Sequence, residues 1–177
     1  MNQYKLKDLI IQKKLLNTLF YKTKTFEQFQ NLIDKGFDIN SRDSSGTTPL
    51  MIANSSKVAE WLIKAGADVN AKNHFGETSL MKATDPEIIK ILINEGADIN
   101  ITDNDGTTVL MKATDPEIIE TLINAVADVN IENNNKENAL IFMEKLLTEK
   151  YEELQIIQEH VKKYEELKGI ILQKMKK

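Results

Sequence analysis

The chain has 177 residues, no cysteine and a formal net charge of −4 at pH 7. The absence of cysteine excludes disulfides, thiolate metal sites and cysteine nucleophiles, and it fits a reducing compartment. The slightly acidic balance argues against a dedicated nucleic-acid binder, because such proteins usually present a basic face.

The amino-terminal stretch lacks the uninterrupted apolar core of a signal peptide. No apolar run in the sequence approaches the length that a transmembrane helix needs. We therefore expect a cytoplasmic protein, or one exported by a route that leaves no such signal, and we do not expect it to bind membranes.

Residues 1–41 are expected to form capping helices and a degenerate first repeat. The segment from Tyr4 to Tyr21 has the pattern of a lysine-rich amphipathic helix. Such a helix could lie on an anionic membrane or bind a partner, but a cap over a neighbouring repeat is the favoured interpretation. Thr25 begins a capping box for a second helix, which is expected to close at Lys35 and Gly36.

Residues 42–135 repeat themselves with a period of 30 residues. The period is marked by two residue types, glycine at Gly46, Gly76 and Gly106, and leucine at Leu50, Leu80, Leu110 and Leu140. A fixed period of this size indicates one small unit stacked on copies of itself. Because a single unit cannot bury its own apolar stripe, the stripes must face neighbouring units.

Each unit is expected to contain a turn, a very short helix, a tight corner and a longer helix. In the third unit, Thr78 can cap a short helix from Ser79 to Ala83. Asp85 is a natural cap for the longer helix, and Pro86 suits its first position. Gly96 is expected to end that helix in a left-handed conformation.

The residues at two points of the unit carry a resemblance to a known family. The strings G-T-T-P-L-M from Gly46 to Met51 and A-G-A-D-V-N-A-K from Ala65 to Lys72 resemble the ankyrin repeat. The resemblance extends roughly from Phe26 to Asn135. It implies an all-α solenoid of helix-turn-helix repeats with helical caps at both ends. It also implies that another protein binds to the turn tips and the concave face.

Three features depart from the family pattern. The period of 30 residues is shorter than the usual ~33, which predicts a short first helix and a shallow concave wall. The family's histidine is replaced by methionine, which offers adaptable apolar packing, at Met51, Met81 and Met111. Val126 stands where other units have Gly66 and Gly96. Since a β-branched residue resists positive φ, we expect the fourth unit to end its helix differently.

Several side chains are candidates for contact with a partner. Phe75 is an aromatic residue in a turn whose equivalents are Ser45 and Asp105, so it is a candidate anchor, although local packing is an equally good explanation. A lone Trp could mark an interface with a partner, but Trp61 aligns with Ile91, so a partly buried packing role is favoured. The candidate partner-binding residues are Ser44, Ser45, Thr47, His74, Phe75, Glu77, Lys82, Asn104, Asp105, Thr107 and Lys112.

Lys82 and Lys112 recur one period apart on the short helix. They are interpreted either as a cationic ladder for an acidic partner or, slightly preferred, as two solvated lysines.

Residues 136–177 are expected to form carboxy-terminal capping helices, either one long helix or two. The apolar positions from Tyr151 to Ile171 have near-heptad spacing, which also allows a coiled-coil arm. A cap over the last repeat is favoured, and a structural oligomer held by this segment is the alternative.

No pattern in the sequence indicates catalysis or a cofactor. The two histidines, His74 and His160, lack the spacing of a metal pair, and there is no phosphate-binding loop or nucleophile elbow. The protein is therefore expected to be a binding module, not an enzyme, whose partner is another protein. An inhibitor or immunity-type protein that blocks a partner enzyme is an alternative.

Overall fold

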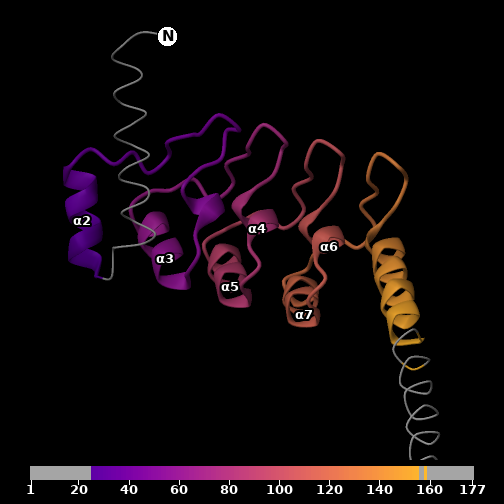
Figure 1. Cartoon of the computed structure of the whole chain (residues 1–177). Helices are drawn as coiled ribbons and strands as arrows, with labels where there is room; N and C mark the ends of the chain where they lie inside the picture. Colours follow the sequence, from indigo (N-terminus) through magenta and orange to yellow (C-terminus); the bar gives the residue numbers. More distant parts are fainter. Residues whose placement is uncertain (1–24, 156–157, 159–177) are drawn as a thin grey trace, which may run out of the picture.

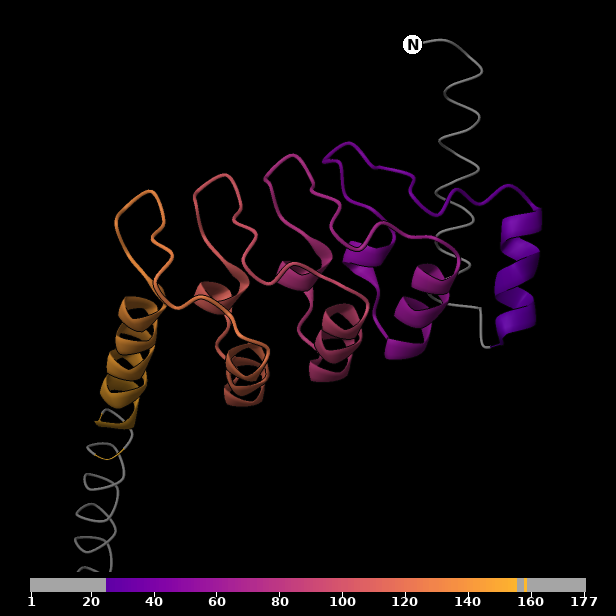
Figure 2. The same cartoon turned by 180° about the vertical axis from the view of Figure 1, so that it is seen from behind.

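The structure is a computed structural model that describes residues 25–155 and residue 158. Pairs of one short and one longer helix stand side by side in a row (Figures 1 and 2). The elements are α2 (Phe26–Asp34), η1 (Leu50–Ile52), α3 (Ser56–Lys64), α4 (Ser79–Lys82), α5 (Pro86–Asn94), α6 (Val109–Lys112) and α7 (Pro116–Asn124). Residues 139–155 are also helical, and no strand occurs among the described residues. The predicted all-α solenoid is confirmed.

The short helices begin at capping threonines. The hydroxyl of Thr78 accepts a hydrogen bond from Met81 N at 3.4 Å, and Thr108 caps α6 in the same way. Both helices contain only four residues, because the backbone becomes extended at Ala83 and Ala113. The predicted cap at Thr78 and the short first helix of the unit are therefore confirmed.

The longer helices begin at the predicted corner. Asp85 accepts from Glu87 N at 2.9 Å, and its equivalent Asp115 caps α7. Proline follows each cap at the start of the helix, where the missing N–H costs no hydrogen bond. In the first described unit, Thr25 likewise caps α2 by accepting from Gln28 N.

The core is a continuous apolar seam between the helix pairs. It is lined by residues that recur with the period, namely Leu50, Leu80 and Leu110 on the short helices, and Leu62, Leu92 and Leu122 on the longer ones. Trp61 lies in this seam with its ring 5.7 Å from that of Phe29, so its predicted packing role is confirmed. Each unit thus buries its stripe against its neighbours, as expected for stacked repeats.

Asparagine side chains join the turns that follow the longer helices of successive units. Asn40 accepts from Asp68 N at 2.9 Å and donates to Gly66 O at 3.0 Å. Asn70 makes the same pair of bonds with the next turn. Asn100 accepts from Asp128 N at 2.8 Å, which continues the series to the fourth unit.

The expected amino-terminal helix from Tyr4 to Tyr21 lies outside the described residues. At the other end, Ala139 and Phe142 pack against the core, so the start of the last helix covers the fourth unit. Residues 147–155 are all exposed, and the helix leads away from the stack (Figure 1).

Helix α7 ends in the same way as the other long helices, so the prediction made from Val126 was wrong. Val126 has φ of 65°, close to the 85° of Gly96. Val126 N donates to Ile123 O at 3.0 Å and Ala127 N donates to Leu122 O at 3.1 Å, as in the earlier units. These bonds and the neighbouring turn hold the conformation, and they outweigh the steric cost of positive φ, about 1–2 kcal/mol for a residue with a side chain.

We expect Val126→Gly to raise the free energy of unfolding by about 1 kcal/mol, because it relieves the positive φ. The valine side chain is 81% exposed, so its removal leaves no cavity. Urea denaturation followed by circular dichroism measures the change. The reverse substitution, Gly96→Val, should be destabilising. A loss of stability in Val126→Gly would mean that positive φ does not strain the wild-type turn.

Candidate protein-binding surface

Four loops project from the same edge of the stack, and we call them the tip row: residues 43–47, 73–77, 103–107 and 133–137 (Figures 1 and 2). Each loop is held from inside by one side chain. In the second, Asn73 Oδ1 accepts from Phe75 N and Glu77 N, both at 2.9 Å, and Asn73 N donates to Glu77 O. The same arrangement occurs at Asp43, Asp103 and Asn133.

These four loop residues were not among the candidates predicted from the sequence. Their signal was present, because an aspartate or asparagine recurs there with the period of the repeat. Such side chains commonly accept from backbone N–H groups two residues further on. The tips are therefore closed loops with fixed backbones.

Hydrogen bonds also join each tip to the next. His74 N donates to Ser45 O at 2.8 Å, Asn104 N to Phe75 O at 3.0 Å, and Asn134 N to Asp105 O at 2.9 Å. The contact is close enough to require glycine. A Cβ atom on Gly76, which has positive φ, would lie 2.6 Å from Asn104 Oδ1. The tip row is consequently one connected, rigid edge.

The candidate residues of the tips differ widely in exposure. Phe75 is 61% exposed, and Ser44, His74, Asn104 and Asp105 are also exposed. The Asn104 amide, however, already donates to His74 O at 2.9 Å.

Three other tip candidates are less accessible. Ser45 and Thr47 are partly covered, and Thr107 is only 9% exposed. Thr107 therefore offers little surface to a partner.

Lys112 is neither available to an acidic partner, as the cationic-ladder interpretation requires, nor simply solvated. Its Nζ atom lies 3.0 Å from Glu77 Oε1 of the preceding unit and 2.9 Å from Asp103 Oδ2. Glu77 also accepts from Asn73 Nδ2 at 2.9 Å and lies 3.4 Å from Lys82 Nζ. Glu77 and Lys112 thus bind their own chain across a repeat boundary.

The environment of Glu77 favours its ionised form. The hydrogen bond from Asn73 is the largest influence, and together with Lys112 and Lys82 it outweighs burial and lowers the pKa of Glu77 from 4.5 to about 2. Burial acts to lower the pKa of Lys112, but its hydrogen bonds to Asp103 and Glu77 raise that pKa overall. Both shifts stabilise the charged pair near neutral pH.

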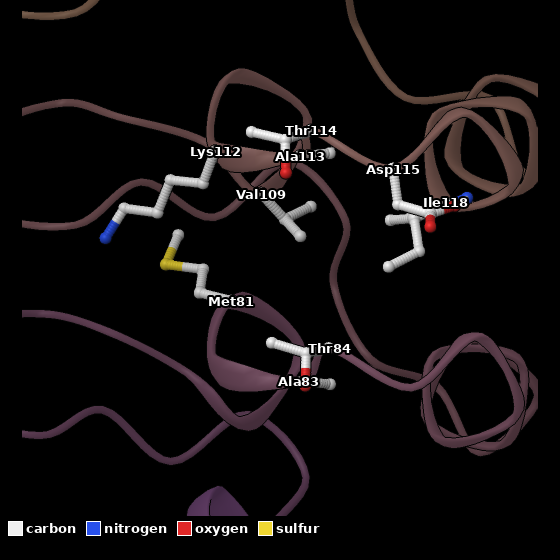
Figure 3. A pocket seen from close by; sticks show the side chains of 9 residues that line it. All are labelled: Met81, Ala83, Thr84, Val109, Lys112, Ala113, Thr114, Asp115 and Ile118. Atoms are coloured by element: carbon white, nitrogen blue, oxygen red, sulfur yellow. Dashed lines mark hydrogen bonds between the residues drawn. The ribbon is translucent and has the colours of Figure 1, made fainter.

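A shallow pocket of about 200 Å³ lies between α4 and α6. Met81 and Val109 line it between Lys112 on one side and Ile118 on the other (Figure 3). The predicted methionine packing is seen at Met51 and Met111, which are buried, whereas Met81 is partly exposed at this pocket.

Within the described part of the chain, no group of three or more His, Asp or Glu side chains could hold a metal ion. Among the same residues, no helix is both long and apolar enough to span a bilayer.

We expect Glu77→Gln to make the free energy of unfolding less dependent on pH below neutrality. A carboxylate whose folded pKa is lowered contributes stability above its unfolded pKa, and that contribution is lost as the pH falls through the folded value. For Glu77 this window runs from 4.5 down to about 2. Allowing for partial solvent screening, the contribution at neutral pH is about 2 kcal/mol.

Urea midpoints of wild type and variant at pH 6 and pH 3 would measure this contribution. The difference between the two proteins should shrink at the lower pH. Glu120→Gln, at an exposed position on α7, is the matched control. A constant difference at both pH values would show that the Glu77 charge does not stabilise the fold.

Comparison with curated proteins finds no match to this chain. A family model described as "Ankyrin repeats (3 copies)" matches residues 13–73 and 54–133, which together are more than half of the sequence. Ankyrin repeats are generally protein–protein interaction modules, and the family is typically non-enzymatic. The chain belongs to the ankyrin-repeat family.

Proposed function

We propose that this protein binds a partner protein through the tip row and the adjoining concave face, with Phe75 as the central anchor. The observation that carries the proposal is the 61% exposure of an aromatic side chain on a loop whose backbone is fixed. The equivalent positions in the other tips are Ser45, Asp105 and Asn135, so the repeat does not itself require an aromatic residue there.

The rigidity of the loop makes this exposure useful for binding. Asn73 Oδ1 accepts a hydrogen bond from Phe75 N on one side, and Asn104 N donates to Phe75 O on the other. A partner would therefore meet a preformed surface and lose little conformational entropy on association. Large aromatic side chains at such sites commonly dominate binding energy.

The Phe75 tip and the unit before it also expose polar side chains and a second apolar residue. His74 and Ser44 are exposed on the same and the preceding tip. Lys82 is 36% exposed, and its only ion pair among the described residues is the 3.4 Å contact with Glu77. Ile52, which stands one period before Lys82, is 42% exposed. A partner with an apolar pocket for Phe75 and an acidic margin near Lys82 would fit this set.

Replacing Phe75 with alanine should weaken partner binding at least ~10-fold, because the anchor is lost while the loop backbone remains bonded. Affinity purification from native cells with the wild-type chain as bait, followed by mass spectrometry, would identify the partner. Titration calorimetry with that partner would then compare wild type and Phe75→Ala. Lys82→Ala should have a smaller effect that decreases with added salt.

Ile123→Ala is the matched control, because Ile123 is an exposed apolar residue on α7, away from the tips. Lys112→Ala is unsuitable as a test of binding, since Lys112 stabilises the chain itself. Equal affinity of wild type and Phe75→Ala for the partner would refute the proposed surface. Loss of affinity in Ile123→Ala alone would place the binding surface on the long helices.

A further inference from the structure

The pocket between α4 and α6 is apolar inside. Val109 and Ile118 line its interior and are only 5% and 6% exposed. Ala83 and Ala113, which end the two short helices, also line it, and their small side chains leave the space between the helices unfilled. The pocket therefore offers apolar contacts to a side chain that enters it from outside.

The size of the pocket and one of its walls suit a single side chain. Its volume of about 200 Å³ is below the ~300–1,000 Å³ that small-molecule sites usually have. Met81 forms one wall and is partly exposed, whereas its equivalents Met51 and Met111 are both 4% exposed (Figure 3). A methionine side chain is flexible and polarizable, so this wall can adjust to the shape of an apolar group.

Asp115 places an unpaired negative charge at the rim. Its Oδ1 atom accepts hydrogen bonds from Glu117 N at 2.8 Å and Ile118 N at 3.3 Å, both of which belong to the helix that it caps. Among the described residues, no lysine or arginine forms an ion pair with its carboxylate. Lys112, on the opposite side of the pocket, is already matched by two other carboxylates, so it does not neutralise Asp115.

The corners next to the pocket carry charge of the same sign. Residues 84–90 and 114–120 contain five acidic residues and one lysine. That lysine, Lys90, is held between Glu87 Oε1 at 2.9 Å and Glu117 Oε1 at 3.1 Å. A cation at the rim would therefore lie in a negative potential, and an acidic group there would be repelled.

We propose that this pocket, with Asp115 at its rim, receives an apolar side chain of the partner protein that stands next to a lysine or arginine. The apolar group packs on Val109, Ile118 and Met81. The neighbouring cation contacts Asp115 Oδ2, which accepts no hydrogen bond from the described residues. The inference rests on the proposed function and extends it, because it specifies the chemistry of a short stretch of the partner.

Short peptides test the pocket without the partner protein. The full chain, isotopically labelled at its methionine methyl groups, is titrated by NMR into the millimolar range with acetyl-Leu-Arg-amide, acetyl-Leu-Glu-amide or acetyl-Gly-Arg-amide. The Met81 signal should move most with the first peptide. Affinity should be ~3-fold lower with glutamate, as expected for an exposed ion pair, and ~10-fold lower without the leucine side chain. The signal of the buried Met51 serves as the internal reference.

Asp115→Asn isolates the effect of the charge, because asparagine can still cap α7. In this variant the ~3-fold preference for acetyl-Leu-Arg-amide over acetyl-Leu-Glu-amide should disappear. Asp85→Asn is the matched control, since Asp85 caps α5 in the same way but does not line the pocket. Ala113→Leu fills the pocket and should abolish the movement of the Met81 signal with every peptide.

Equal affinity for all three peptides would overturn the inference, because the pocket would then recognise neither group. A Met81 signal that does not move, or a preference for arginine that persists in Asp115→Asn, would also overturn it. The titration involves neither Phe75 nor the partner protein, so a negative result leaves the proposed function standing. Equal affinity of the partner for wild type and Phe75→Ala would in turn leave the peptide result unaffected.

Discussion

The structure depends on hydrogen bonds and apolar contacts that repeat between neighbours at the 30-residue period. Asn40 and Asn70 each bind the turn of the next unit, and every described tip after the first donates a backbone N–H to the tip before it. These polar contacts fix the spacing of the units, while the leucine seam supplies the apolar burial. Because each unit contacts only its neighbours, the fold has no single central core, and its stability depends on the contacts between adjacent units.

Some elements of these units could be predicted from the sequence and others could not. The caps at Thr78 and Asp85 and the left-handed Gly96 follow from local backbone chemistry, which the sequence carries directly. Val126 was mispredicted because the intrinsic preference of valine was considered without the bonds that hold its turn. The backbone hydrogen bonds that close the end of α7 outweighed the side-chain preference at that residue.

The candidate surface, too, could be predicted only in part from the sequence. The exposure of Phe75 agrees with its departure from the polar pattern of the other tips, which is a feature of the sequence alone. The pairing of Lys112 with Glu77 could not be read from periodicity, because Glu77 is replaced by Thr47 and Thr107 in the neighbouring units. Contacts that do not recur with the period depend on the residues of the neighbouring unit, so they are seen only in the structure.

The Lys112 bridge has a consequence for how the gene can vary. The third and fourth units share the segment M-K-A-T-D-P-E-I-I, so recombination between the two copies could remove or add a whole module without interrupting the leucine seam. Such a deletion would keep Glu77 and remove the tip that carries Thr107, so the unit before that of the remaining lysine would carry Thr47 and would offer it no glutamate across the boundary. The shortened array would keep its leucine seam but would lose the ion pair that now joins Lys112 to Glu77 across a repeat boundary.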